Sequence, residues 1–125
     1  MARQGSKWKI IDGDQTLCDG IHLLLLPGHT PGLQGVLVNT AEGECILASD
    51  AVPLYECIEG LQQEKYGISS LCDNLGDFYH TFDRLRELQE KENVKIIASH
   101  DFLTLKWYGC NTECATDDRM NKKYL

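Results

Sequence analysis

Apolar residues occur along this chain in short runs that end at Gly, Pro or Asp. Three of these runs have the length of a β-strand: IHLLLL (21–26), ECILAS (44–49) and VKIIAS (94–99). Near-continuous apolar runs of this length are typical of strands that are covered on both faces. The pattern therefore predicts that these three segments lie inside a sheet.

Three further segments, which are more polar than these runs, are also predicted to be strands of the sheet. They are KWKII (7–11), QTLC (15–18) and LQGVLV (33–38). Asp-Gly turn signals at 12–14 and 19–20 separate the first strands, and NTAEG (39–43) predicts a hairpin between 33–38 and 44–49.

One helix is predicted over GDFYHTFDRLRELQEKEN (76–93). Phe78, Phe82, Leu85 and Leu88 recur at three- and four-residue steps and form a single apolar stripe. Residues 52–74 show little periodicity and are predicted to be a loop with room for one short helix. The order of elements predicts an α/β, α+β-layered domain in which one sheet packs against a helix.

The length and charge of the chain narrow its class. We expect 125 residues to form a single domain, with a loose N-terminus (1–6), a structured part (7–103) and a tail (104–125) that the pattern does not place. The net charge of −7 argues against nucleic-acid binding or an anionic membrane surface. No apolar run approaches the ~18–20 residues that span a bilayer. No apolar stretch follows the basic N-terminal residues, so we expect no secretory signal and a cytoplasmic protein.

The six cysteines do not suggest a disulfide framework. Cys45 lies in an apolar run and is predicted to be a small buried side chain. Cys110 and Cys114 have C-x3-C spacing, which differs from the C-x2-C of zinc knuckles and redox pairs. A metal or redox role for the cysteines is kept as an alternative.

A polar side chain follows each of the three apolar runs. His29 comes after 21–26, Asp50 after 44–49 and His100 after 94–99. If these strands point the same way, their ends meet at one edge of the sheet, where rigid strands position ligand-binding side chains. Two imidazoles and a carboxylate suit zinc, iron or manganese. Taken singly, each residue is more simply explained as an ordinary turn or helix-capping residue, and only the joint pattern favours a site.

The surroundings of His29 favour a fixed imidazole. The sequence PGHTPG (27–32) places it between two Pro-Gly pairs. Pro27 ends hydrogen bonding to the sheet, Gly28 permits a tight turn, and Pro31-Gly32 reverses the chain. Such brackets fix the direction of the ring, which matters for a metal ligand and little for a surface histidine.

These motifs together resemble a known family. IIDGD (10–14), DGIHLLLLPGHTPG (19–32), Gln34, ILASDAVPLYE (46–56) and ASHD (98–101) resemble the C-terminal half of the metallo-β-lactamase superfamily, in particular its N-acyl homoserine lactonase-like metallohydrolases. The resemblance implies half of an αβ/βα sandwich with one mixed sheet. It also implies that His29 binds one metal, that His100 binds a second, and that Asp50 bridges them. Such metals activate water for the hydrolysis of lactones, thioesters or β-lactams.

The chain departs from the family pattern in two places. The motif H-x-H-x-D-H, which supplies two ligands to each metal in the family, does not occur in these 125 residues. Pro53 stands where lactonase-like members have a tyrosine that helps to hold the substrate carbonyl. Tyr55, two residues further on, is the candidate to replace it.

Three other residues have simpler interpretations. His22 lies in an apolar run and is interpreted as a structural histidine, and His80 beside the helical stripe as a solvated one. Asp101 either supports a neighbouring ligand or forms a turn.

Half of such a sandwich exposes the sheet face that its twin covers, so we expect a homodimer or a complex with a complementary N-terminal-half chain.

We expect a metal-dependent hydrolase of small lactone- or ester-type substrates, inactive as an isolated chain. Asp50 and Tyr55 are its candidate catalytic residues, and His29, Asp50 and His100 its candidate zinc ligands. The alternatives are a non-catalytic metal-binding remnant or association module, and a small redox or metal protein that uses the cysteines.

Overall fold

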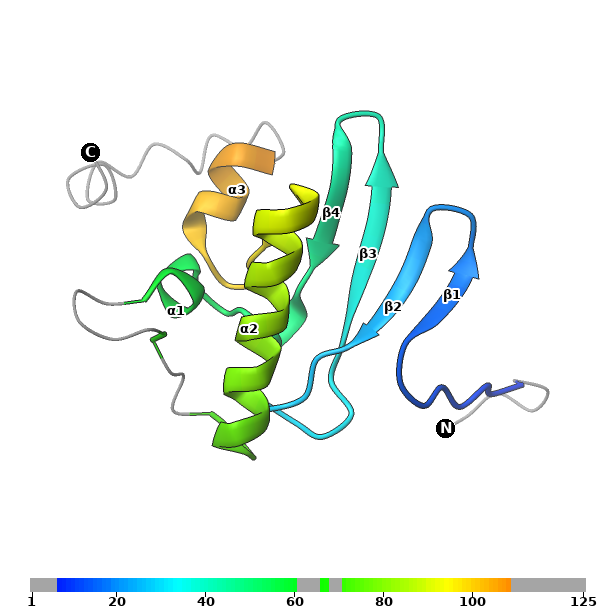
Figure 1. Cartoon of the computed structure of the whole chain (residues 1–125), viewed down its shortest axis with the longest axis horizontal. Helices are drawn as coiled ribbons and strands as arrows, with labels where there is room; N and C mark the ends of the chain where they lie inside the picture. Colours follow the sequence, from blue (N-terminus) through cyan, green and yellow to red (C-terminus); the bar gives the residue numbers. More distant parts are fainter. Residues whose placement is uncertain (1–6, 61–65, 68–70, 109–125) are drawn as a thin grey trace.

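The computed structural model describes residues 7–60, 66–67 and 71–108 of the chain. They form a five-stranded sheet with helix α2 lying along one face (Figure 1). The elements, in chain order, are β1 (Gln15–Cys18), β2 (Ile21–Leu25), β3 (Gln34–Thr40), β4 (Gly43–Leu47), η1 (Ser49–Ala51), α1 (Tyr55–Glu59), α2 (Leu75–Glu92), β5 (Lys95–Ile97) and α3 (Phe102–Tyr108).

The sheet is mixed, and its strands lie in chain order. Strands β1 to β4 form an antiparallel meander, and β5 joins β4 in parallel. Because β3 runs opposite to its two neighbours, β2, β4 and β5 all point the same way. The carboxyl ends of these three strands therefore meet at one edge of the sheet.

Most of the predicted elements are confirmed. Five strand predictions, the hairpin at 39–43, the helix at 76–93 and a short helix within 52–74 all correspond to observed elements. Helix α2 begins at a capping residue, Asn74, whose side chain accepts a hydrogen bond from the Asp77 N–H, and it ends at Asn93 in the left-handed conformation. The N-terminus predicted to be loose (1–6) and residues 109–125, with Cys110 and Cys114, lie outside the described residues.

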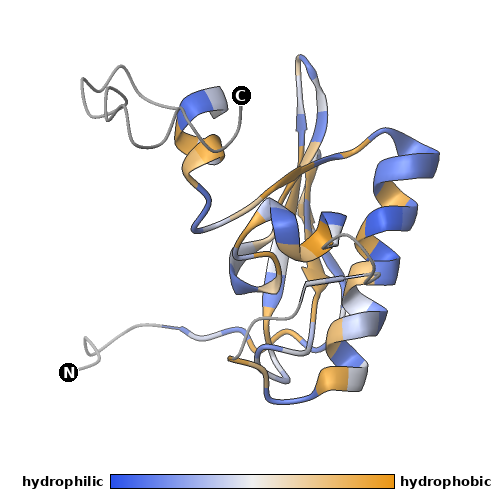
Figure 2. Ribbon diagram, turned by 90° about the vertical axis from the view of Figure 1, so that its left-hand side faces the viewer, coloured by the Kyte–Doolittle hydropathy of each residue, from blue (hydrophilic) through white to orange (hydrophobic). Residues whose placement is uncertain are grey.

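The strand predicted at 7–11 is wrong. This segment is not part of a strand, and its apolar residues Trp8 and Ile10 are 85% and 93% exposed. Figure 2 shows it leading away from the sheet toward the N-terminus. A strand forms only where a neighbour supplies hydrogen-bond partners, and the described part of the chain places no strand beside this segment.

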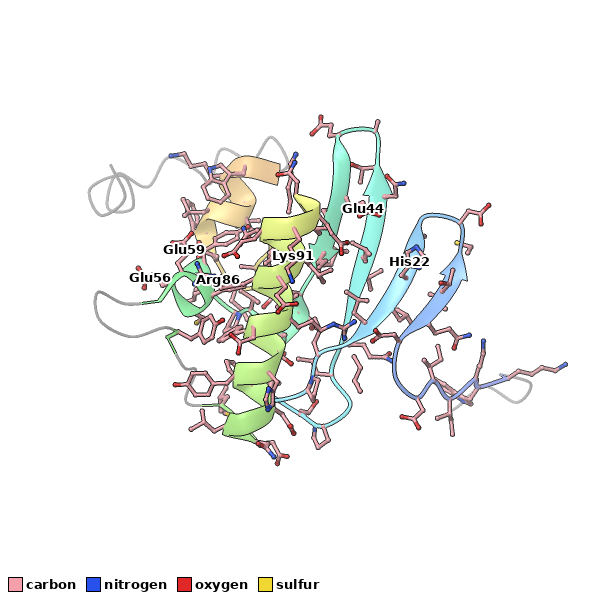
Figure 3. The ribbon with its side chains drawn as sticks, in the orientation of Figure 1. His22, Glu44, Glu56, Glu59, Arg86 and Lys91 are labelled. Atoms are coloured by element: carbon pink, nitrogen blue, oxygen red, sulfur yellow. The ribbon has the colours of Figure 1, made fainter. Side chains whose placement is uncertain are left out.

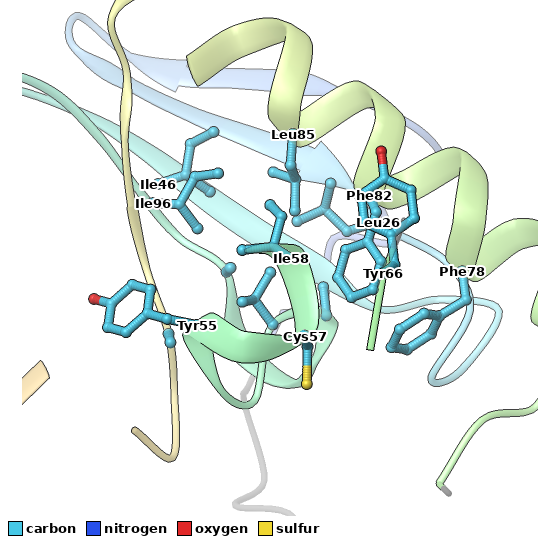
Figure 4. Packing of buried hydrophobic residues seen from close by; sticks show 14 of the residues in the cluster. Leu26, Ile46, Tyr55, Cys57, Ile58, Tyr66, Phe78, Phe82, Leu85 and Ile96 are labelled. Carbon is cyan, nitrogen blue, oxygen red and sulfur yellow. The ribbon is translucent and has the colours of Figure 1, made fainter. Parts of the chain in front are cut away.

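The hydrophobic core lies between α2 and one face of the sheet (Figure 4). The apolar stripe of α2 supplies Phe78, Phe82 and Leu85, all at most 1% exposed, and these pack toward Ile46 and Ile96 from the sheet. The rings of Phe78 and Phe82 meet edge to face, with their centroids 4.6 Å apart. The predicted stripe is therefore the face that holds the helix on the sheet.

The opposite face of the sheet is apolar but not buried. The strand register places Leu23, Val36, Leu47 and Ile97 side by side across four strands. None of these four residues is buried, and Leu47 is 46% exposed. We call this row the open face. The prediction that the apolar runs are covered on both faces is therefore met on the α2 side only.

An ionic clamp fastens β2 to the helix. Asp14 accepts a hydrogen bond from the Leu25 N–H at 2.8 Å, and Arg84 of α2 donates to the Leu25 carbonyl at 3.0 Å. Arg84 and Asp14 also form an ion pair. The clamp satisfies both backbone groups of Leu25, the last residue of β2.

Candidate metal centre

The edge where β2, β4 and β5 end brings together the three polar residues predicted to meet there. The Nε2 atom of His29 lies 3.7 Å from Oδ2 of Asp50, and the Nε2 atom of His100 lies 2.8 Å from Oδ1. Each imidazole therefore faces a different oxygen of one carboxylate. Their side chains are 24%, 41% and 67% exposed for His29, Asp50 and His100, so the cluster opens to solvent.

His29 is held in one orientation by its surroundings. Its Nδ1 atom lies 2.8 Å from the Leu71 carbonyl oxygen. A carbonyl only accepts hydrogen bonds, so Nδ1 is the donor in this contact, and Nε2 is the ring nitrogen that faces Asp50. The preceding turn is docked on α2, because a Cβ atom on Gly28 would lie 2.6 Å from the Phe78 Cα. The Pro27 carbonyl accepts a hydrogen bond from Thr81 of α2 at 2.6 Å.

Asp50 sits in a strained turn directly after β4. The residue before it, Ser49, has a φ of 51°, in the left-handed region that is costly for a residue with a Cβ atom. The 3-10 turn η1 (Ser49–Ala51) follows, closed by hydrogen bonds from the Ala51 and Val52 N–H groups. This turn aims the Asp50 carboxylate at the sheet edge instead of along the strand.

His100 is anchored through its backbone. Its N–H donates to the Pro53 carbonyl at 2.9 Å, and the Ser99 N–H donates to the Val52 carbonyl at 3.0 Å. The segment after β5 is thereby tied to the segment after β4. These two hydrogen bonds bring the imidazole of His100 next to Asp50, which lies 50 positions earlier in the chain.

The donor atoms of the cluster suit a divalent metal. Zinc binds imidazole nitrogen and carboxylate oxygen at about 2.0–2.2 Å, so two donors on one tetrahedral ion lie roughly 3.3 Å apart. The separation of 3.7 Å between His29 and Asp50 is close to this value, whereas 2.8 Å between His100 and Asp50 is a direct hydrogen bond. Imidazole and carboxylate also bind iron and manganese.

Within residues 7–60, 66–67 and 71–108, no group of three or more His, Cys, Asp or Glu side chains is arranged to hold one metal ion. His29, Asp50 and His100 nevertheless meet pairwise at the Asp50 carboxylate, and their assignment as metal ligands stays a prediction. Since the two imidazoles face opposite carboxylate oxygens, the arrangement instead offers two places with one histidine and one oxygen each.

Tyr55 does not extend into this cluster. It is 8% exposed, its hydroxyl lies 3.2 Å from the Thr104 hydroxyl, and its ring packs on Trp107 with centroids 5.2 Å apart. These contacts give Tyr55 a packing role at the start of α1. Its predicted role in holding a substrate carbonyl has no support in this geometry.

Asp101 has a role that the sequence left open. Its two carboxylate oxygens accept hydrogen bonds from the N–H groups of Tyr55 and Leu103, at 2.9 Å and 2.8 Å. It therefore contacts backbone at the starts of α1 and α3, and within the described residues it makes no hydrogen bond to the imidazole of His100. No sequence signal identified Tyr55 as its partner, because the two residues are 46 positions apart.

The remaining histidines lie away from the cluster. His22 is on β2, labelled in Figure 3, and its Nδ1 atom lies 2.9 Å from the Thr16 hydroxyl. His80 is exposed on α2. Both placements agree with their interpretation as structural and solvated residues.

The cysteines among the described residues form no disulfide and no metal-binding group. Cys18, Cys45, Cys57 and Cys72 are free thiols. Burial raises the pKa of the Cys57 thiol, which keeps it protonated and unreactive. Cys45 is half-buried, less covered than predicted, because its strand position faces away from α2.

Among the described residues, no helix is long and apolar enough to cross a membrane.

The fold and the cluster together define part of a metallo-β-lactamase-type domain. A solved N-acyl homoserine lactone hydrolase, with the product N-hexanoyl-L-homoserine bound at its catalytic metal centre, matches 85% of this chain with a TM-score of 0.69 and 29% identity. A dizinc quorum-quenching lactonase shares the fold over 81% of the chain, with a TM-score of 0.56 and 19% identity. The match covers 40% of the first structure's chain and 32% of the second's.

Sequence comparison agrees with the structural match. An N-acyl homoserine lactonase of Bacillus thuringiensis is 32% identical over 95 residues, which is 75% of this chain and 36% of the relative. No family model matches the chain. The chain is homologous to the N-acyl homoserine lactonases over about three quarters of its length, and it spans little more than a third of theirs.

Proposed function

We propose that this chain supplies one part of a two-metal centre for the hydrolysis of small lactone- or ester-type substrates. The observation that carries the proposal is the placement of His29 and His100 on different oxygens of Asp50. In this assignment His29 and Asp50 would hold one zinc ion, and His100 and Asp50 would hold the other, with iron or manganese as alternatives. When bound, such ions provide an activated water and polarise the carbonyl under attack.

The residues of this chain bind and orient in the proposed reaction. The Leu71 carbonyl keeps the proton on Nδ1 of His29, so that Nε2 is available as a ligand. The strained turn at Ser49 directs the Asp50 carboxylate between the two imidazoles. Two protein donors for each ion are fewer than the three that catalytic zinc sites use, so the isolated chain is expected to bind metal weakly and to be inactive.

The missing ligands are proposed to come from a complementary polypeptide segment that carries H-x-H-x-D-H. The open face supports this partner, because a row of four apolar residues that are not buried, with Leu47 46% exposed, favours association. A second copy of this chain could also cover the open face, but it would not contribute that motif. The relatives are more than twice as long as this chain, so most of the homologous structure lies outside it.

A mixing experiment tests the function. The chain is combined, with zinc, with a polypeptide from the other half of the family fold that carries H-x-H-x-D-H, and opening of N-hexanoyl-homoserine lactone is followed. We expect turnover in the mixture, none with either part alone, and none when the chain carries Asp50→Ala. Zinc binding without turnover in the mixture would favour the second candidate, a non-catalytic metal-binding or association module.

A further inference from the structure

We infer that Asp101 is a positioning residue that sets the distance between His100 and Asp50 by holding their two segments together. The inference rests on the proposed metal role of those two residues. Both oxygens of the Asp101 carboxylate accept backbone hydrogen bonds, one from α1 and one from α3. The carboxylate therefore links the two helices that follow the two proposed ligands in the chain.

The link continues a row of backbone contacts. The Ser99 N–H donates to the Val52 carbonyl and the His100 N–H to the Pro53 carbonyl, at 3.0 Å and 2.9 Å. The Tyr55 N–H then donates to Asp101 at 2.9 Å. Residues 99–101 and 52–55 therefore lie side by side, and Asp101 closes the end of the row beside His100.

Thr104, in the first turn of α3, supports the same junction. Its hydroxyl lies 2.8 Å from the Ala98 carbonyl and 3.2 Å from the Tyr55 hydroxyl. The junction therefore has two side chains that bind both segments. Tyr55, predicted to contact substrate, contributes its N–H and its hydroxyl to this structural link instead.

The chemistry of the position explains why a carboxylate is needed. An ionised Asp offers only acceptors, and here each oxygen receives one N–H. An Asn would turn its NH2 group toward one of these N–H donors and lose that bond. An Ala would leave both donors without their partner. Since ligand distances in metal sites are set within about 0.2 Å, a small shift of residues 99–101 changes the fit of His100.

Amide hydrogen exchange of the metal-free protein tests this inference without any activity. We compare wild type with Asp101→Ala and with a matched control, Thr40→Ala. Thr40 also makes two backbone hydrogen bonds, at 2.6 Å and 3.2 Å, but in the β3–β4 turn. We expect the Ser99 and His100 amides of Asp101→Ala to exchange at least tenfold faster relative to the Val38 amide of β3. The control should leave this ratio unchanged.

Zinc titration of the same three proteins gives the second readout. We expect the dissociation constant to rise about tenfold in Asp101→Ala and to stay within twofold of wild type in Thr40→Ala. Unchanged exchange at Ser99 and His100 overturns the inference, as does an equal acceleration of all amides, which reports lower global stability only. Local acceleration with unchanged zinc affinity overturns the role toward the metal. If wild type binds no zinc, the proposed function fails, and the exchange ratio alone decides whether Asp101 holds the two segments.

Discussion

The Nε2 atom of His100 lies 2.8 Å from Oδ1 of Asp50, although the two residues are 50 positions apart. Neither residue reaches the other through local structure. Asp50 is directed by the strained turn at Ser49, and His100 by the backbone bond to Pro53. His29 approaches the other oxygen of the same carboxylate from a third strand end. This convergence is the basis for the predictions on metal binding.

Removing a ligand should lower zinc uptake. His29→Ala and His100→Ala are each expected to weaken zinc binding by tenfold or more, because each removes one of two donors to one ion. His80→Ala is the control, since this histidine is exposed on α2. Zinc content after dialysis and isothermal titration measure the effect. Equal zinc content in all four proteins would contradict the ligand assignment.

The open face should drive association with a partner. Leu47→Glu is expected to abolish binding of the complementary segment, because a charge replaces an apolar side chain at the centre of the row. Leu75→Glu is the matched control: Leu75 lies on α2 and is 49% exposed, against 46% for Leu47. Light scattering coupled to size exclusion measures the complex and also any homodimer. If the chain stays monomeric and does not bind the complementary segment at micromolar concentration, the open face is not a docking surface.

Gly28 should tolerate no side chain. Its φ of 134° disfavours other residues, and a Cβ atom would lie 2.6 Å from the Phe78 Cα, which is backbone and cannot move aside. Gly28→Ala is expected to lower the free energy of unfolding by about 1–3 kcal/mol. Gly32→Ala in the same loop serves as control, because nothing lies within 4 Å of its added Cβ. Urea denaturation measures both variants, and equal midpoints would refute the close approach.

The Asp14–Arg84 clamp predicts a dependence of stability on acid. The hydrogen bond from Arg84 lowers the pKa of Asp14 below its ordinary value of 3.8, with the Leu25 N–H adding to this and partial burial opposing it. A lowered carboxyl pKa stabilises the folded state above pH 3.8, and the contribution is lost as the pH falls through the lower folded value.

Asp14→Asn should therefore be less stable than wild type near pH 7. Both side chains of the pair are more than a third exposed, so solvent screening keeps the difference to no more than about 1 kcal/mol. The difference should shrink as the pH falls below 3.8, and thermal unfolding at pH 7 and in acid measures it. A difference that persists at low pH would show that the substitution acts by another route.

The three residues of the candidate site were easier to predict from the sequence than the groups that hold them in place. The sequence indicated His29, Asp50 and His100 because each is the first polar residue after an apolar run, and the structure places them together. It did not indicate the partners that hold them, such as the Leu71 carbonyl. Backbone partners leave no residue-type signal in a sequence.

Local patterns alone determined most of the elements of this protein. Alternation and helical periodicity depend on neighbouring residues, so β1 to β5 and α2 could be predicted before any contact was known. Two features depended on distant contacts instead. KWKII has the pattern of a strand but no neighbouring strand in the described residues, and Tyr55 is buried by its contacts with Thr104 and Trp107. Pairing and burial are decided by what the folded chain brings alongside, and only the tertiary structure contains that information.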